Sequence, residues 1–161
     1  AWAAARGVPL VPLAELLPAA DAVTLHVPLT PETRDLIAAD ALARMKPGAV
    51  LVNTCRGEVV DPAALAAAVR SGHLAGAGVD VFAVEPPPAD HPLLGVPNVV
   101  LTAHTAGVDT RSHRDMARLP AEAIVQLLGG GWPADWVVNP QVKGAWRLGE
   151  TPAVPVVYHV G

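Results

Sequence analysis

The fold is decided by residues 49–81, which read AVLVNTCRGEVVDPAALAAAVRSGHLAGAGVDV. Two short apolar runs, Ala49–Asn53 and Gly76–Val81, flank a segment of helical composition, Pro62–Arg70. Both runs are largely apolar on both faces, which is typical of strands buried in a parallel sheet. The helical segment follows a cap residue, Asp61, and has proline at its first position. The stretch therefore predicts a strand, a helix and a second strand in that order.

The same alternation extends to both sides of this stretch. Strands are expected at Ala22–His26 and Val99–Thr102, and a weaker candidate lies at Val8–Val11, where Pro9 favours an edge strand or a loop. Alternating strands and helices with short connections predict a doubly wound α/β fold with a parallel sheet. The remaining short helices are expected at Leu13–Leu17 and Ala38–Met45.

The pattern changes near the C-terminal third to one longer helical segment, Asp109–Leu128, which the glycines at 129–131 end. Pro120 lies inside this segment and lacks a backbone donor, so we expect the helix to kink or break near Leu119. We expect the sequence after Pro140 to be irregular.

Composition and charge exclude several classes of protein. The 161 residues suit one domain. The 11 basic and 15 acidic residues are not clustered, so the sequence shows no basic patch of the kind that binds nucleic acid or an anionic membrane. One cysteine excludes an internal disulfide, and the lack of paired Cys/His spacings argues against a metal site. No apolar run approaches the ~20 residues of a membrane span. We expect a cytoplasmic protein. The sequence opens with Ala1 and not with methionine, part-way through its pattern of elements, which suggests a piece of a longer chain.

Three polar residues stand just beyond the predicted strands. Arg56, Glu85 and His104 each follow the end of a different strand by a few residues. Ligands of an open α/β sheet bind in the crevice outside the carboxyl ends of its strands. The sequence therefore predicts that a guanidinium, a carboxylate and an imidazole meet at one edge of the sheet. Spacing alone leaves the alternative open that these are solvated loop residues in surface ion pairs.

These three side chains suit the interconversion of a 2-oxo acid and a 2-hydroxy acid. A guanidinium binds a carboxylate at two points and polarises a neighbouring carbonyl oxygen. An imidazole, with an ordinary pKa of about 6.5, gives or takes a proton near neutral pH. A carboxylate beside it stabilises the imidazolium and fixes the orientation of the ring. The reaction also needs a hydride carrier.

Several stretches of the chain carry a resemblance to a known family. They are DAVTLHVPLTPETRDLI (21–37), MKPGAVLVNTCRGEVVD (45–61), GAGVDVFAVEP (76–86), NVVLTAHTAG (98–107) and VNP (138–140). In their order, spacing and residue identity, over roughly residues 1–140, the chain resembles the D-isomer-specific 2-hydroxyacid dehydrogenases. Motifs of this length are far more specific than a lone glycine fingerprint. The resemblance implies a Rossmann-like, dinucleotide-binding fold.

The resemblance also implies roles for individual residues. Arg56 would bind the substrate carboxylate and carbonyl, His104 would be the acid/base, and Glu85 would be its partner. The implied cofactor is NAD or NADP. Cys55 has no histidine beside it in sequence, which favours a packing or backbone-contact role over a nucleophile. The positions that match the family's cofactor contacts are Val27, Thr54, Cys55, Arg56, Asp80, His104, Ala106 and Gly107.

The chain departs from the family's pattern in its extent. The glycine-rich phosphate loop and the substrate domain have no counterpart in the sequence, so we expect the α/β domain to be incomplete. We expect a partial dinucleotide-binding domain at 1–107, a helix returning toward the substrate domain at 108–142, and an irregular tail at 143–161. Without a phosphate loop, the chain by itself is expected to bind dinucleotide poorly and to turn over little or nothing.

The function expected for the full-length protein is hydride transfer between NAD(P)H and a 2-oxo acid, giving a D-2-hydroxy acid. Its partners would be the small acid and a second copy in a homodimer, with no nucleic acid and no membrane. Two alternatives stay open: a non-catalytic dinucleotide-sensing module and an inactive truncated fragment. Which 2-hydroxy acid is used cannot be read from the sequence, because the residues that fit its side chain would come mainly from the missing domain.

Overall fold

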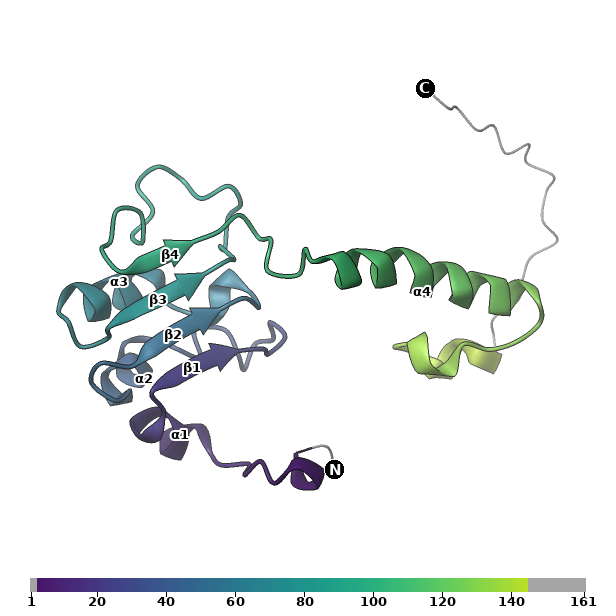
Figure 1. Cartoon of the computed structure of the whole chain (residues 1–161), viewed down its shortest axis with the longest axis horizontal. Coiled ribbons are helices and arrows are strands. Elements are labelled where there is room, and N and C mark those ends of the chain that lie inside the picture. The colour runs from purple at the N-terminus through teal and green to yellow at the C-terminus, as the bar shows by residue number, and fades with distance from the viewer. Residues whose placement is uncertain (1–2, 145–161) are drawn as a thin grey trace. The chain divides into compact units, whose positions relative to one another are not determined.

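The computed structural model describes residues 3–144, and the chain divides into two compact units between Gly107 and Val108 (Figure 1). The first unit holds a four-stranded sheet in which every neighbouring pair is parallel. The predicted parallel α/β sheet is therefore confirmed. The strands follow one another across the sheet in chain order: β1 (Ala22–Leu25), β2 (Val50–Asn53), β3 (Gly76–Val79) and β4 (Val99–Leu101).

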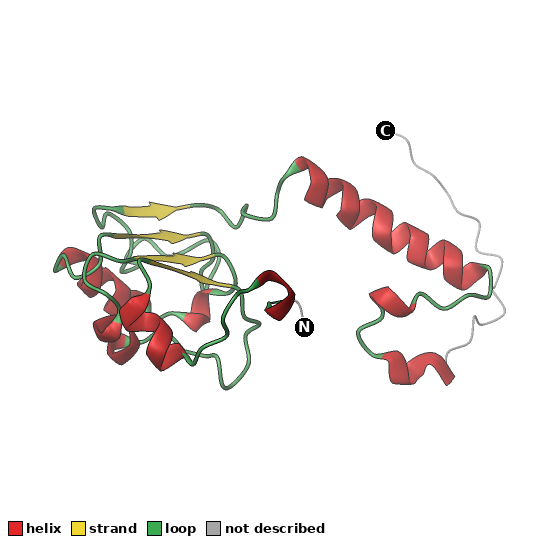
Figure 2. Ribbon diagram, turned by 60° about the horizontal axis from the view of Figure 1, so that its bottom comes forward, coloured by secondary structure: helices red, strands yellow, loops and turns green. Residues whose placement is uncertain are grey.

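The helices of this unit pack on one face of the sheet (Figure 2). Right-handed crossovers between consecutive parallel strands, all running in one direction, place each connecting helix on the same side. Burial along β1 agrees, because Val23 and Leu25 are buried while Ala22 and Thr24, which alternate with them, are exposed. The helices are α1 (Leu13–Ala19), α2 (Ala39–Arg44) and α3 (Pro62–Arg70), with 3₁₀ turns η1 (Ala4–Arg6) and η2 (Gly57–Val59).

The core fills the space between the sheet and these helices. Leu51, in β2, is fully buried, as are Leu17, Ile37 and Leu65. Full burial of such a side chain contributes about 1.5–3 kcal/mol relative to its exposure. The loops at the ends of the strands are therefore anchored to a well-packed support.

The register of the strands aligns their carboxyl ends. Leu25 lies opposite Asn53, Asn53 opposite Val79, and Val79 opposite Leu101. The last residues of all the strands thus share one line across the sheet, and the loops that follow them start from the same edge. This alignment positions the candidate site.

Two local expectations can be judged in detail. Helix α3 has the predicted bounds, and the Asp61 carboxylate accepts hydrogen bonds from the backbone N–H groups of Ala63 (2.9 Å) and Ala64 (3.1 Å). The weaker strand candidate at Val8–Val11 is a loop of exposed residues and not an edge strand. Pro9 and Pro12 lack the N–H groups that a ladder needs, which explains this outcome.

The second unit holds one long helix, α4 (Thr110–Leu128), which Asp109 caps by accepting from the amides of Arg111 (2.8 Å) and Ser112 (3.0 Å). Of the kink or break expected near Leu119, the break is wrong, because the helix runs through Pro120 without interruption. An ion pair from Arg118 to Glu122 (2.7 Å) bridges the proline and supports the turn that lacks one backbone bond.

Short 3₁₀ turns follow α4 within the described residues: η3 (Ala134–Trp136) and η4 (Pro140–Gly144). The expected irregular tail at 143–161 lies almost wholly outside the described residues. Across the part of the chain that the structure describes, no helix is both long enough and apolar enough to span a membrane.

Candidate active site

The predicted acid/base pair is assembled at the carboxyl edge of the sheet. Nδ1 of His104, in the loop after β4, lies 2.8 Å from Oε2 of Glu85, in the loop after β3. The other carboxylate oxygen, Oε1, accepts a hydrogen bond of 2.9 Å from the backbone N–H of Phe82. Because Nδ1 faces the carboxylate, it carries the proton of the neutral ring, and Nε2 is the nitrogen left for a reacting molecule.

The electrostatics of the pair follow from these contacts. The Phe82 amide, and after it the His104 ring, hold the pKa of the Glu85 carboxyl below its ordinary value. Glu85 is therefore a carboxylate at neutral pH and can stabilise an imidazolium at His104. Both side chains are accessible, with 51% of His104 and 38% of Glu85 exposed. A small molecule can reach the ring.

A buried carboxylate, Asp80, holds the loop that carries His104. Its Oδ1 accepts from the amide of Thr105 (2.8 Å) and from the hydroxyl of Thr102, and its Oδ2 accepts from the amide of Ala106 (2.8 Å). The backbone oxygen of Asp80 accepts from the amide of His104 at 2.8 Å. His104 has a φ of 56°, a left-handed conformation that is uncommon outside glycine and needs such support.

The charge state of Asp80 fits this role. Burial raises the pKa of the Asp80 carboxyl, but the hydrogen bonds from Thr102 and the Ala106 and Thr105 amides outweigh burial, and the pKa lies below its ordinary value. Only 3% of Asp80 is exposed. The sequence analysis predicted a cofactor contact for Asp80, and it gave Thr102 no role at the site. The signal in the sequence that could have pointed to Thr102 is its position two residues before His104.

Arg56 lies on the neighbouring loop, after β2. Its side chain is exposed, and its Nη1 donates to the carbonyl of Cys55 at 2.6 Å. Among residues 3–144, neither Glu85 nor His104 is hydrogen-bonded to Arg56. The structure thus joins two members of the predicted trio directly and brings the third to the same edge on an adjacent loop.

The residues predicted to contact a cofactor lie along the same edge. Val27 follows β1, and Asp80 follows β3. The positions after β2 are Thr54, Cys55 and Arg56, and those after β4 are His104, Ala106 and Gly107. Cys55 is buried, and its Sγ donates to Oδ1 of Asn53 at 3.1 Å, which agrees with a packing role. Gly107 has open space around the position of a missing Cβ. An open edge with small residues beside an exposed imidazole fits a flat nicotinamide ring.

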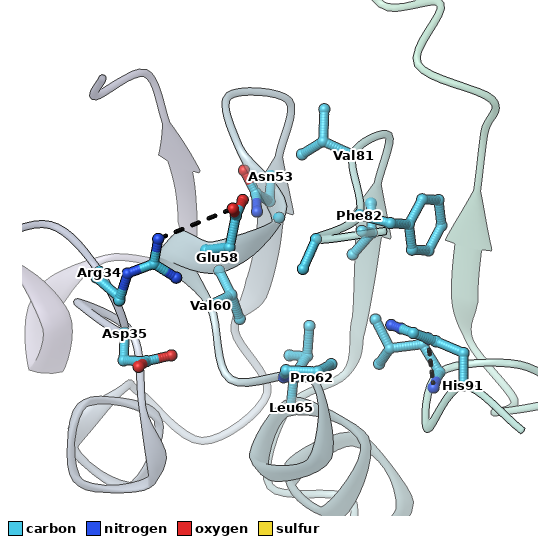
Figure 3. A pocket seen from close by; sticks show the side chains of 14 residues that line it. Arg34, Asp35, Asn53, Glu58, Val60, Pro62, Leu65, Val81, Phe82 and His91 are labelled. Carbon is cyan, nitrogen blue, oxygen red and sulfur yellow. Dashed lines mark hydrogen bonds and ion pairs between the residues drawn. The ribbon is translucent and has the colours of Figure 1, made fainter. Parts of the chain in front are cut away.

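Two hollows flank the loops of this edge. One, of about 440 Å³, is mostly apolar and lies against Glu85 and His104, with Pro86, Leu94 and Leu101 among its walls. The other, of about 220 Å³, is lined in part by the loop after β2 and the loop after β3 (Figure 3). At its mouth, Arg34 and Glu58 form a long ion pair of 3.9 Å.

Comparison with known proteins decides the family. Residues 2–106 match the model of the NAD-binding domain of D-isomer specific 2-hydroxyacid dehydrogenases. The chain belongs to this family. The match confirms the resemblance found in the sequence, and it confirms a nicotinamide dinucleotide as the family's cofactor.

Individual members of the dehydrogenase family are closely similar. A glyoxylate reductase of Korarchaeum cryptofilum is 47% identical over 137 residues, which cover 85% of this chain and 41% of that protein. The crystal structure of the TT0316 protein from Thermus thermophilus has a TM-score of 0.71 and 46% identity, covering 78% of this chain and 40% of that one.

A further solved relative, a D-isomer specific 2-hydroxyacid dehydrogenase from Xanthobacter autotrophicus Py2 in complex with NADPH and MES, is 44% identical with a TM-score of 0.65. The aligned part covers 74% of this chain and 48% of that one. The chain thus spans less than half the length of these relatives.

Proposed function

We propose that the whole protein containing this chain is an NAD(P)-dependent D-2-hydroxyacid dehydrogenase, which interconverts a 2-oxo acid and a D-2-hydroxy acid. The observation that carries the proposal is the 2.8 Å contact between His104 Nδ1 and Glu85 Oε2 at the carboxyl edge of the sheet. A ring oriented in this way by a carboxylate is an acid/base group. Family membership supplies the class of reaction in which that group takes part.

In this proposal the residues of the chain bind the acid and move the proton. The reduced nicotinamide, when bound, supplies a hydride to C2 of the 2-oxo acid. Arg56 binds the carboxylate at two points and polarises the carbonyl at C2. Nε2 of protonated His104 donates its proton to the C2 oxygen, so that the carbonyl becomes a hydroxyl. Glu85 stabilises the imidazolium before the transfer and keeps the ring oriented after it.

The proposed cofactor contacts follow the loops of the carboxyl edge. Thr54, Cys55 and Arg56 would line the ribose next to the nicotinamide, Val27 would lie nearer the adenosine, and Ala106 and Gly107 would approach the ring with their backbone. Asp80 would receive the carboxamide through the single accepting position that its Oδ2 retains beside the Ala106 amide.

The proposal extends to the organisation of the protein. Residues 108–142, which include α4, would return from the dinucleotide-binding domain at 1–107 toward a substrate domain. We also propose a cytoplasmic homodimer, with the small acid as the only other partner.

The experiment mixes the whole protein with NADH or NADPH and either glyoxylate or hydroxypyruvate, and follows the loss of nicotinamide absorbance. Turnover that depends on both reactants supports the proposal. Tight binding of NAD(H) without turnover of these or longer 2-oxo acids would instead favour the dinucleotide-sensing alternative.

A further inference from the structure

We infer that Asn53 and Gly57 are positioning residues, which together fix Arg56 beside the Glu85–His104 pair. Neither residue had a role in the sequence predictions, and neither is placed to touch the reacting atoms itself. The inference rests on the proposed function, because it concerns the geometry of the residue that would bind the substrate carboxylate.

Asn53 holds the turn that carries Arg56. Its Nδ2 donates to the backbone oxygen of Arg56 at 2.8 Å, and its Oδ1 accepts from the backbone N–H and from the Sγ of Cys55, both at 3.1 Å. Only 1% of Asn53 is exposed, and Asn53 and Asp80 are the buried polar residues of the described core. The buried amide therefore depends on this turn for its hydrogen bonds, and releasing the turn would leave a buried polar group without partners.

Gly57 lets this turn lie directly on the loop that carries Glu85. A Cβ built on Gly57 would lie 2.2 Å from the carbonyl carbon of Phe82, 2.3 Å from the nitrogen of Ala83 and 2.6 Å from the Cα of Phe82. All of these are backbone atoms, which cannot swing aside as the end of a side chain can. The backbone of Gly57 does not need a left-handed φ, so the glycine is required for space and not for conformation.

The two contacts connect the predicted trio into one assembly. Phe82, which Gly57 touches, is the residue whose N–H holds Oε1 of Glu85 at 2.9 Å. The path from the guanidinium to the imidazole therefore runs through Arg56, Gly57, Phe82, Glu85 and His104. Figure 3 shows Asn53, at the end of β2, and Glu58, in the loop after it, near Val81 and Phe82 of the loop after β3. A displacement at Gly57 would change the separation of Arg56 from the acid/base pair.

Other glycines of the sheet provide matched controls. A Cβ on Gly78, in β3, would make only ordinary contacts of 3.8 Å with Val52. A Cβ on Gly76 would lie 2.6 Å from the backbone oxygen of Asn98. This is a comparable clash at the first residue of β3, the end of the strand away from the candidate site. Gly76→Ala therefore reports destabilisation without a change at Arg56, and Gly78→Ala reports the added methyl group alone.

The kinetic test uses the whole protein, with NADH and glyoxylate, at a temperature where every variant is shown by circular dichroism to be folded. Gly57→Ala is expected to lower kcat/KM about 100-fold, mainly through a higher KM for glyoxylate, because a shift of about 1 Å in a binding group can cost that much. Gly76→Ala and Gly78→Ala should stay within about threefold of the wild type. In an Arg56→Lys background the cost of Gly57→Ala should shrink at least about threefold, since both changes act on one contact.

An equal cost of Gly57→Ala in both backgrounds, or an equal loss in Gly76→Ala, would overturn the inference.

A second readout does not need activity: amide hydrogen exchange of Cys55 in the 161-residue chain should speed up at least about tenfold in Asn53→Ala and in Gly57→Ala. The amide of Ala64, held by Asp61, should stay unchanged as an internal reference. If the wild type reduces no 2-oxo acid, the proposed function fails. Separately, unchanged exchange of the Cys55 amide in both variants would refute the inference that Asn53 and Gly57 fix the turn that carries Arg56.

Discussion

Replacing Asp80 by asparagine should weaken the loop that carries His104, by an amount that the hydrogen bonds allow us to work out. The carboxylate accepts from Thr102, Thr105 and Ala106, whereas an asparagine has only one accepting oxygen. If that oxygen keeps Thr102 and Thr105, the new NH₂ group faces the N–H of Ala106. One hydrogen bond to a charged acceptor is lost, worth about 1.5–3 kcal/mol, and the remaining ones lose their charge assistance. We expect a destabilisation of about 3 kcal/mol.

The assay is urea unfolding of the chain at a series of pH values, with Asp21→Asn as the matched control. Asp21 pairs with Lys46, but 85% of its side chain is exposed, so its loss should cost less than about 1 kcal/mol. The pKa of Asp80 is lowered in the folded state, so its stabilisation is complete above the unfolded value of about 3.9 and is lost as the pH falls through the folded value. A cost for Asp80→Asn below about 1 kcal/mol, or one that does not shrink in acid, would refute this reasoning.

Further predictions concern the other residues of the edge and one control outside it. Arg56→Lys should raise the KM for the 2-oxo acid at least about tenfold with a smaller change in kcat, because an ammonium cannot make the planar two-point contact; an unchanged KM would contradict this. Glu85→Gln should lower kcat about 100-fold while binding of NADH stays the same, as measured by steady-state kinetics and fluorescence titration. Asp61→Ala should cost about 1 kcal/mol in urea unfolding through the lost cap of α3, and kcat should not change.

The sequence was sufficient to predict the elements that depend on local signals. Helix α3 has a cap residue, a proline at its first position and a glycine just past its end, and both of its bounds were predicted. The strands were recognisable as short, largely apolar runs, although burial on both faces was wrong for β1, where Ala22 and Thr24 are exposed. Each of the strand predictions that correspond to β1–β4 was one or two residues longer than the structure has it. Loop residues that follow aligned strands could be placed at one edge because the strands were recognisable.

Contacts between residues far apart in the chain could not be predicted from local sequence patterns. The side-chain hydrogen bonds of Asp80 reach residues 22 to 26 positions further along the chain, and its backbone bond to His104 also crosses between strands. The close approach of Gly57 to Phe82 likewise depends on how two loops pack after the sheet has formed. Local propensity also favoured a break at Pro120, whereas α4 continues through this residue and Arg118 pairs with Glu122 across it.

The role of His104 as proton donor is tested most directly by a single-turnover experiment with glyoxylate, in which the whole protein is in excess over NADH. Comparison of the wild type with His104→Ala should show hydride transfer slowed about 1,000-fold, with the Kd for NADH within about twofold. Transfer that proceeds in the variant within about tenfold of the wild-type rate would contradict the assignment of the acid/base group.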